Sequence, residues 1–296
     1  MRGKPTEPTT RLWGLVAARA RVAVVFRRGP SKQVRLALWD LATDQLTYGQ
    51  WLSGRIYNER CGLSPGGKLL VYFAGKFKTR IPTFTALSRP PYFTALALWP
   101  DGSTWGGGGF FEDDRRLVLN YGRVIDELNG GKGIPADFCV TSVSEHRERH
   151  AATDGPEASQ GWTLKERGSE GERDVDPMMA VVFTRPWIQT RVSPRRPRLT
   201  LERWWLGMFE VNGPHSVYSF RLVETPKGAH GEPAVEELGR LDWADWDHDG
   251  SLLFSRDGCL FRRNLTGGPS EPMLIADLRD QTFANLRPPP EALVWP

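Results

Sequence analysis

Three aspartates alternate with other residues ahead of a glycine near the end of the chain. Asp245, Asp247 and Asp249 precede Gly250, which matches the start of a calcium loop, D-x-D-x-D-G. Alternate carboxylates can converge on a hard cation, and the glycine allows the sharp bend of such a loop. A complete EF-hand loop would place Glu at its twelfth position, where this chain has Arg256. We therefore interpret the segment as an acidic strand ending in an Asp-Gly turn, with a calcium site at the three aspartates as the alternative.

Five arginines lie close together around a Pro-rich stretch that precedes a Trp-Trp pair: Arg191, Arg195, Arg196, Arg198 and Arg203. Basic side chains beside aromatic rings can hold single-stranded nucleic acid through charge and stacking. The competing interpretation is an exposed Pro-Arg loop that leads into a strand whose Trp204 and Trp205 are core residues. We favour the loop, and we keep the five arginines as the best candidates for binding an acidic partner, either protein or nucleic acid.

Two further motifs fail on their sequence context. Residues 62–66 match the G-x-S-x-G pattern of a nucleophile elbow, which needs a strand-to-helix turn and a backbone N–H after the serine. Because Pro65 has no N–H and an apolar strand follows, we predict a β-turn there. His146 and His150 stand four apart, as zinc ligands on one helix face do. Charged residues surround both histidines, so we predict a solvated loop.

Two glycine-rich runs, at residues 106–109 and 130–133, lack the G-K-[ST] ending and the strand-to-helix context that phosphate binding requires. The first run is expected to permit close packing of a strand or a bend between blades. The motifs therefore predict no catalytic residue and no cofactor-binding residue.

The composition is that of a globular protein. Of 296 residues, 40% are hydrophobic and 25% are charged, with a formal net charge of +4, which excludes the disordered class. We attribute the excess of arginine over lysine to genome composition, since 35 acidic residues are interspersed with the basic ones. Cys61, Cys139 and Cys259 form no disulfide framework or CxxC knuckle. With no secretory segment and no apolar run of about 18 residues, we expect a cytoplasmic protein without a membrane partner.

A recurring phrase favours a repeat built from hairpins. Leu-Ala-Leu-Trp occurs at residues 36–39 and again at 96–99, and a turn with a short apolar strand follows each copy. Residues 34–45 resemble the strand end and Trp-Asp turn of a WD40 repeat. Residues 63–70 resemble the inner hairpin of WD40 and TolB-type blades, and residues 249–254 match that turn more closely. The resemblance, which covers about three blades, implies a β-propeller.

We therefore predict an all-β, propeller-like fold of about five to seven four-stranded blades. Residues 1–10 are expected to form a flexible tail and residues 11–296 a single domain. The clearest blade has predicted strands over 242–249, 251–257, 259–264 and 272–278. An irregular, partly disordered insertion is expected at about 122–177, because much of that segment is charged or small.

A propeller carries its function on the loops at its rims, so the fold does not select the activity. Our leading hypothesis is a non-enzymatic platform for protein–protein interaction in a cytosolic complex. One alternative is a hydrolase or lyase with a site in the central channel, drawn from His215, His230 and His248 with the three aspartates. The other is a nucleic-acid-associated module that uses the five arginines.

Overall fold

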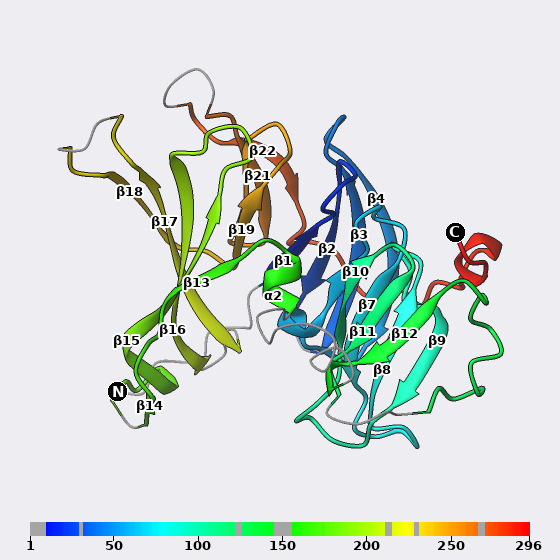
Figure 1. Ribbon diagram of the computed structural model, residues 1–296. Helices are drawn as coiled ribbons and strands as arrows, with labels where there is room; N and C mark the ends of the chain where they lie inside the picture. The colour runs from blue at the N-terminus through cyan, green and yellow to red at the C-terminus, as the bar shows by residue number, and fades with distance from the viewer. Residues whose placement is uncertain are drawn as a thin grey trace. The chain divides into compact units, whose positions relative to one another are not determined.

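The computed structural model describes residues 10–29, 32–121, 126–144, 156–173, 175–210, 215–227, 231–265 and 270–296. The chain is nearly all β, with 52% strand and 5% helix arranged in several antiparallel sheets (Figure 1). The all-β prediction is confirmed, and no closed barrel or propeller is found within these ranges. Nor does any helix in them have the length and apolar character needed to cross a membrane. The predicted tail lies outside them except for Thr10.

Contacts within the chain divide it into two compact units. The first unit comprises Met1–Gly14, Gly29–Ser31 and Gly161–Gln281, and the second comprises Leu15–Arg28, Lys32–Gln160 and Thr282–Pro296. The division falls within the first strand, after Gly14. The single domain over residues 11–296 stays a prediction.

The chain begins with a sheet in the order β1-β2-β3-β4. Its strands are β1 (Arg11–Val16), β2 (Val22–Arg28), β3 (Gln33–Asp40) and β4 (Gln45–Ser53). The predicted Trp-Asp turn joins β3 to β4. The Asp40 carboxylate accepts hydrogen bonds from the N–H groups of Ala42 (2.8 Å) and Thr43 (3.2 Å), which is how aspartate stabilises a turn. Trp39 is fully buried and donates from Nε1 to Asp44 at 3.0 Å.

A second sheet has the order β5-β7-β8-β9, with β6 beside β7. The elements are β5 (Arg55–Ile56), the 3-10 helix η1 (Asn58–Arg60), β6 (Gly62–Leu63), β7 (Leu70–Gly75), β8 (Thr83–Ser88) and β9 (Ala95–Pro100). The turn between β6 and β7 contains the G-x-S-x-G match. Ser64 is buried there, and its hydroxyl accepts hydrogen bonds from the N–H groups of Lys68 and Leu69 at 3.1 and 3.0 Å. The predicted β-turn is therefore confirmed.

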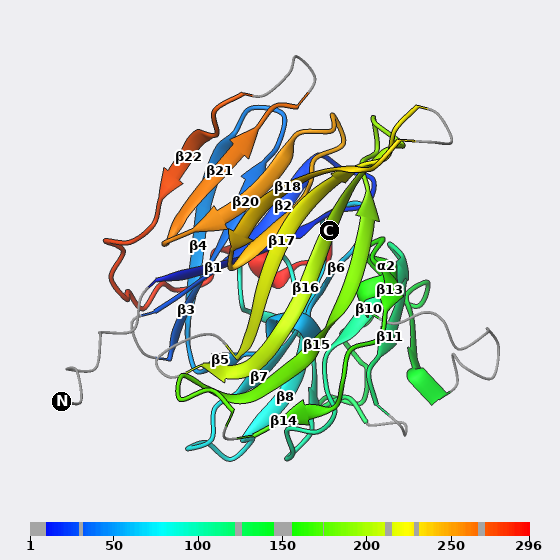
Figure 2. The ribbon, with the colours of Figure 1, turned by 90° about the vertical axis from the view of Figure 1, so that its left-hand side faces the viewer.

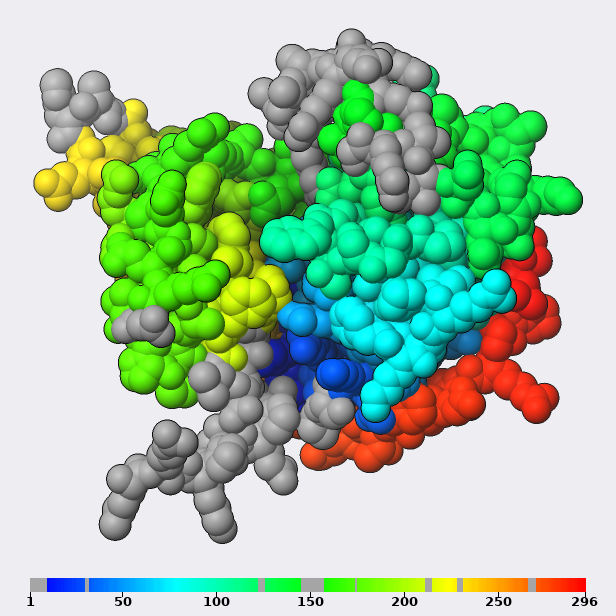
Figure 3. Space-filling view, turned by 90° about the horizontal axis from the view of Figure 1, so that it is seen from below, coloured from blue at the N-terminus to red at the C-terminus, as the bar shows by residue number. Residues whose placement is uncertain are grey.

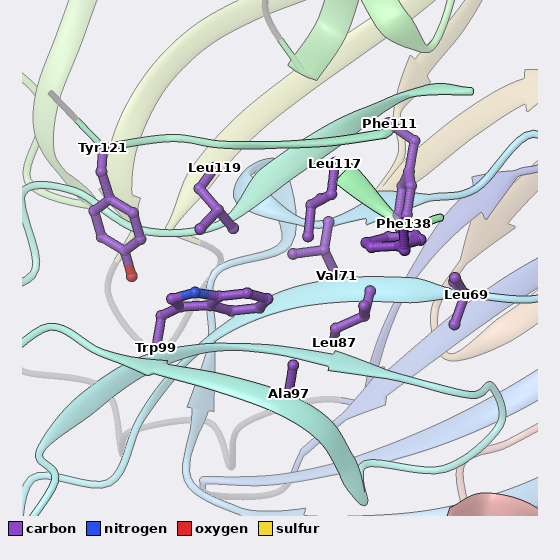
Figure 4. Packing of buried hydrophobic residues seen from close by; sticks show 10 residues of the cluster. All are labelled: Leu69, Val71, Leu87, Ala97, Trp99, Phe111, Leu117, Leu119, Tyr121 and Phe138. Carbon is purple, nitrogen blue, oxygen red and sulfur yellow. The ribbon is translucent and has the colours of Figure 1, made fainter. Parts of the chain in front are cut away.

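A hydrophobic cluster of the second unit joins this sheet to the three-stranded sheet β10-β11-β12. The latter contains β10 (Gly109–Asp113), β11 (Arg116–Leu119) and β12 (Cys139–Ser142), with β11 and β12 parallel. Figure 4 shows Trp99 from β9 facing Leu119 from β11. Trp99 is 2% exposed, so both copies of the Leu-Ala-Leu-Trp phrase place a large ring in a core. The short helices α2 (Pro156–Ser159) and η2 (Pro290–Leu293) also belong to this unit.

The first unit contains a sheet of long strands in the order β13-β15-β16-β17-β18, with β14 beside β15 (Figure 2). Its strands are β13 (Thr163–Glu166), β14 (Gly171–Glu172), β15 (Met179–Val192), β16 (Leu199–Glu210), β17 (Ser216–Glu224) and β18 (Ala234–Arg240). β13 and β14 fall within the predicted irregular insertion, as does β12. The described part of that segment therefore supplies strands to two sheets.

The other sheet of the first unit is the meander β19-β20-β21-β22. It contains β19 (Trp243–Trp246), β20 (Leu252–Arg256), β21 (Cys259–Arg263) and β22 (Met273–Asp277), which confirms the four strands predicted for the clearest blade. Asp257 and Gly258 have φ of 50° and 74°. Positive φ at both central residues is typical of the two-residue turn that matches strand twist.

We expect Asp242, just before β19, to make the stability of the protein depend on pH. Its carboxylate lies 3.4 Å from Arg11 and accepts the N–H of Leu12. Burial nevertheless raises the pKa of Asp242 to about 6 in the folded protein. The folded state therefore holds this proton more tightly than the unfolded state does. The stability that the proton contributes is present at low pH and is lost as the pH rises through 6. Between pH 5 and pH 8 we expect the unfolding free energy of the wild type to fall by about 1 kcal/mol more than that of Asp242→Asn. Urea unfolding at both pH values checks this, and parallel pH profiles would contradict it.

Candidate functional site

The arginines predicted to bind an acidic partner begin on β15, where Arg191 points into the protein. Its guanidinium pairs with the carboxylate of Asp245, which is 4% exposed. The main-chain carbonyl of Arg191 accepts a hydrogen bond from Trp246 Nε1 at 2.9 Å. Burial raises the pKa of Asp245, although Arg191 opposes that rise. Arg191 therefore neutralises a buried carboxylate.

Arg203 on β16 is also buried, at 4% exposed. Its Nε donates to Gln189 at 3.0 Å, and its guanidinium carbon lies 4.5 Å from the centre of the Trp162 ring and 5.2 Å from that of Tyr218. Cation–π contacts of this kind stabilise a cation away from water. Arg203 therefore belongs to the interior of the first unit.

The remaining predicted arginines lie in the turn between β15 and β16. Arg195 donates to the carbonyl of His248 at 3.0 Å. Arg196 donates to the carbonyl of Leu265 and to Glu224, both at 2.8 Å. Arg198 is half-buried. The guanidinium groups of four of the five arginines thus have hydrogen-bond acceptors inside the first unit: Arg191, Arg195, Arg196 and Arg203. Binding of an acidic partner by this cluster stays a prediction.

Trp204 and Trp205, expected in the core, are half-buried. Trp204 lies under the guanidinium of Arg221, 4.0 Å from its carbon, and donates to Glu202 at 3.1 Å. Glu202 also accepts hydrogen bonds from Lys165 and Arg221, each at 2.6 Å. Although burial raises the pKa of Glu202, these hydrogen bonds outweigh it and hold that pKa below its usual range. The charges beside the Trp pair are therefore already paired.

The three aspartates of the predicted calcium loop are bound by arginines and by turn N–H groups. Asp247 is fully buried and accepts from Arg262 at 2.6 Å. Asp249 accepts the N–H of Ser251 at 2.8 Å and lies 3.5 Å from Arg262. Within the described ranges no group of three or more His, Cys, Asp or Glu side chains is placed to hold a metal ion. The geometry thus accords with the acidic strand and Asp-Gly turn, in which Gly250 has φ of 86°.

Of the histidines proposed for a channel site, the two described ones lie apart in the chain, at the ends of different strands. His215 stands at the start of β17 with its ring 4.5 Å from that of Phe209. His248 follows β19, and its Nδ1 lies 3.6 Å from the carboxylate of Asp247. His230, like the pair His146 and His150, is outside the described residues.

Two adjoining hollows of about 340 and 260 Å³ run along β18 in the first unit, and we call them together the β18 groove. The first is lined by Arg196, Leu199, Leu222, Glu224, Ala234, Val235, Glu236, Arg263 and Leu265. The second is lined by Glu236, Glu237, Leu238, Leu241, Phe254, Arg256, Arg263, Ser270, Glu271 and Pro272. An ion pair between Arg263 and Glu236 stands where the two hollows meet.

The floor of the first hollow is apolar, and one wall is an open strand edge. The floor consists of three buried leucines, Leu199, Leu222 and Leu265. On the open edge, Val235 of β18 is 51% exposed. Among the described strands, β18 is the last of its sheet, so its outer edge has no partner there. Arg256 donates to the carbonyl of Leu238 at 3.1 Å, across the second hollow. An apolar floor beside an open edge can accept an extended chain.

Sequence patterns do not reveal this groove. Its lining comes from β16, β17, β18, β20 and β21 and from the turns around them, so no local motif marks it. The local signal is the composition of β18, whose short run of alanine, valine and two glutamates has little of the alternation that a half-buried strand shows. Only the pairing of the strands brings the lining residues together.

No family model matches the chain, and no curated protein matches it. A solved structure of Kuenenia stuttgartiensis hydrazine synthase is similar over 88% of this chain and 80% of that one, with 13% identity and a TM-score of 0.35. A variant of the AtxE2 isopeptidase with bound Astexin3-dC4 is similar over 92% of this chain and 47% of that one, with 12% identity and a TM-score of 0.24. At these TM-scores neither likeness carries an argument about fold or function.

Proposed function

We propose that this protein is a non-enzymatic platform for protein–protein interaction, and that its β18 groove binds an extended segment of a partner protein. The observation that carries the proposal is the open edge of β18 beside an apolar floor. A segment that lies along such an edge gains main-chain hydrogen bonds, and its alternate side chains enter the hollow. The leucine floor favours an apolar side chain at those positions.

The charges around the groove favour a segment that also carries lysine or arginine. The side chains of Glu236 and Glu237 are 49% and 67% exposed, although Glu236 pairs with Arg263 and Glu237 lies 3.8 Å from Arg221. The lining holds four carboxylates against three guanidinium groups: Glu224, Glu236, Glu237 and Glu271, and Arg196, Arg256 and Arg263. An excess of acidic groups attracts basic groups and repels acidic ones.

The proposal extends to the architecture and the location. Consecutive four-stranded meanders, such as β1 to β4 and β19 to β22, are the unit from which propellers are built. We propose that these sheets serve as the blades of a propeller-like platform, which leaves their edges and connecting loops for binding. Three free cysteines suit a reducing compartment, and we place the protein in the cytoplasm.

Affinity purification from the native host tests the groove. The double variant Val235→Lys/Glu237→Lys puts two positive charges on β18. The matched control, Leu164→Lys/Glu166→Lys, likewise replaces one aliphatic residue and one glutamate by lysine on β13, the opposite edge of the same sheet, where both residues are exposed. We expect wild type and control to recover the same nuclease-resistant partner, quantified by mass spectrometry, and the β18 variant to recover at least about tenfold less.

Equal recovery of that partner by all three proteins would reject the groove as the docking site. Recovery of no partner by the wild type would reject the platform itself. Circular dichroism of each variant ensures that a loss of binding is not a loss of folding.

A further inference from the structure

A turn in the second unit carries exposed cationic and aromatic side chains together. Lys76, Phe77, Lys78 and Arg80 lie in the connection between β7 and β8. Phe77 is 53% exposed, and Lys78 and Arg80 are exposed as well. Within the described residues, none of the three cations forms an ion pair. Their charges are therefore available to an anionic partner.

The turn has an ordered backbone. The N–H of Lys76 donates to the carbonyl of Pro82 at 2.7 Å, and the N–H of Thr79 donates to the carbonyl of Lys76 at 2.9 Å. The Thr79 hydroxyl lies 2.8 Å from the carbonyl oxygens of both Lys76 and Ile81. These contacts hold the backbone of the turn in one conformation.

A second loop, residues 101–108, presents Trp105, which is 94% exposed. The guanidinium of Arg60 donates to the carbonyls on either side of it, Thr104 at 2.8 Å and Gly106 at 2.6 Å. Gly107 packs against Phe73 so closely that a Cβ there would lie 2.2 Å from the ring. The glycine run predicted to permit close packing thus lets the loop fold tightly while leaving both faces of the indole open.

Both segments lie at the same end of the sheet. The N–H of Asp101 donates to the carbonyl of Thr83 at 2.9 Å, and the N–H of Gly102 donates to the Thr83 hydroxyl at 2.9 Å. Figure 3 looks onto this end, where the cyan atoms of residues 76–82 adjoin the turquoise atoms of residues 101–108. Arg55 pairs with Gly75 at the same end. We call Arg55, Lys76, Phe77, Lys78, Arg80 and Trp105 the basic rim.

Acidic residues do not offset the charge of the basic rim. Glu59 and Asp101 are the two acidic residues in its three segments, residues 54–60, 75–82 and 101–108. The Asp101 carboxylate accepts hydrogen bonds from the N–H and hydroxyl of Ser103 at 3.3 and 3.2 Å. It is therefore turned toward its own loop. Within these three segments five basic residues stand against two acidic ones.

We propose that the basic rim binds single-stranded nucleic acid. Cations that track a phosphate backbone, together with exposed rings on which bases stack, are the two components of such a site. Phe77 and Trp105 offer the rings, and Lys76, Lys78, Arg80 and Arg55 offer the charges. A double helix keeps its bases stacked on one another, so the indole faces favour a single strand. This function is independent of the β18 groove, which lies in the first unit.

Fluorescence anisotropy tests the proposal. The probes are fluorescein-labelled oligo-dT and oligo-U of about 20 nucleotides, which exceeds the site size of typical single-strand binding domains. A duplex of equal length and labelled poly-glutamate serve as comparisons. Trp105→Ala is expected to weaken oligonucleotide binding about tenfold. Lys76→Gln/Lys78→Gln/Arg80→Gln is expected to lower the slope of log Kd against log salt by about 2.

The control is Arg173→Gln/Arg185→Gln, which removes two exposed cations of the first unit that belong neither to the basic rim nor to the arginine cluster, and it should leave binding unchanged. No binding of either oligonucleotide at low salt would overturn the proposal. So would poly-glutamate binding as tightly as oligo-dT with no effect of Trp105→Ala, since that result identifies a surface for acidic protein. An unchanged melting temperature of Trp105→Ala separates a lost contact from a lost fold.

Discussion

Replacing Trp39 by alanine is expected to lower the free energy of unfolding by about 3–5 kcal/mol. Trp39 is fully buried in β3, between Ala23 of β2 and Leu46 of β4. The substitution leaves a cavity where the indole packs. It also removes the hydrogen bond from Nε1 to Asp44, a turn residue with φ of 58°. Urea unfolding followed by circular dichroism measures the loss.

Trp105→Ala is the matched control, because the same change is made at a ring that is 94% exposed. Surface substitutions of this kind change stability by about 0.5 kcal/mol or less. A cost below about 1 kcal/mol for Trp39→Ala would contradict the packing described for β3, because deletion of a buried tryptophan costs several times more.

The second large effect is expected at Asp247, the middle residue of the predicted calcium loop. Asp247→Ala is expected to destabilise the protein by about 3–5 kcal/mol, because it leaves a buried arginine without its main partner. Arg262 is 8% exposed and donates to Asp247 at 2.6 Å. The other carboxylate near it, Asp249, lies 3.5 Å away. Chemical denaturation gives the difference.

Asp249→Ala provides the comparison, since the side chain of Asp249 is 44% exposed. An exposed ion pair contributes about 1 kcal/mol or less, so this variant should remain close to the wild type. Calcium distinguishes the two interpretations of the loop. We expect no change in Tm when calcium is added. A calcium-dependent rise in Tm that is lost in both variants would restore the metal site.

Local signals in the sequence predict much of the strand pattern. Asp257-Gly258 adopts positive φ at both positions, as expected of a two-residue hairpin turn, and the meander from β19 to β22 follows the predicted boundaries. Ser64 and Pro65 lie in a turn, as the Pro-Gly pair and the apolar strand that follows it predict. These predictions succeed because turns and short strands depend on residues that are neighbours in the chain.

Predictions about surface chemistry are less direct, because exposure depends on residues distant in sequence. The arginines from Arg191 to Arg203 look like a basic patch, yet Arg191 meets Asp245 and Arg196 meets Leu265. The residues that form the basic rim attract less notice in the sequence, because Arg55, Lys76 and Trp105 belong to separate segments. Pairing of β5 with β7 and anchoring of residues 101–108 on β8 unite them.

The sequence by itself determined the all-β class, the positions of several turns and the strands of the meander near the end of the chain. Each of these follows from local backbone preference or from the alternation of side chains along a strand. Only the tertiary structure decided which charges are neutralised and which face solvent. The reason is physical: a guanidinium that finds an acceptor in a neighbouring sheet becomes part of the interior, and the sequence does not state which sheets are neighbours.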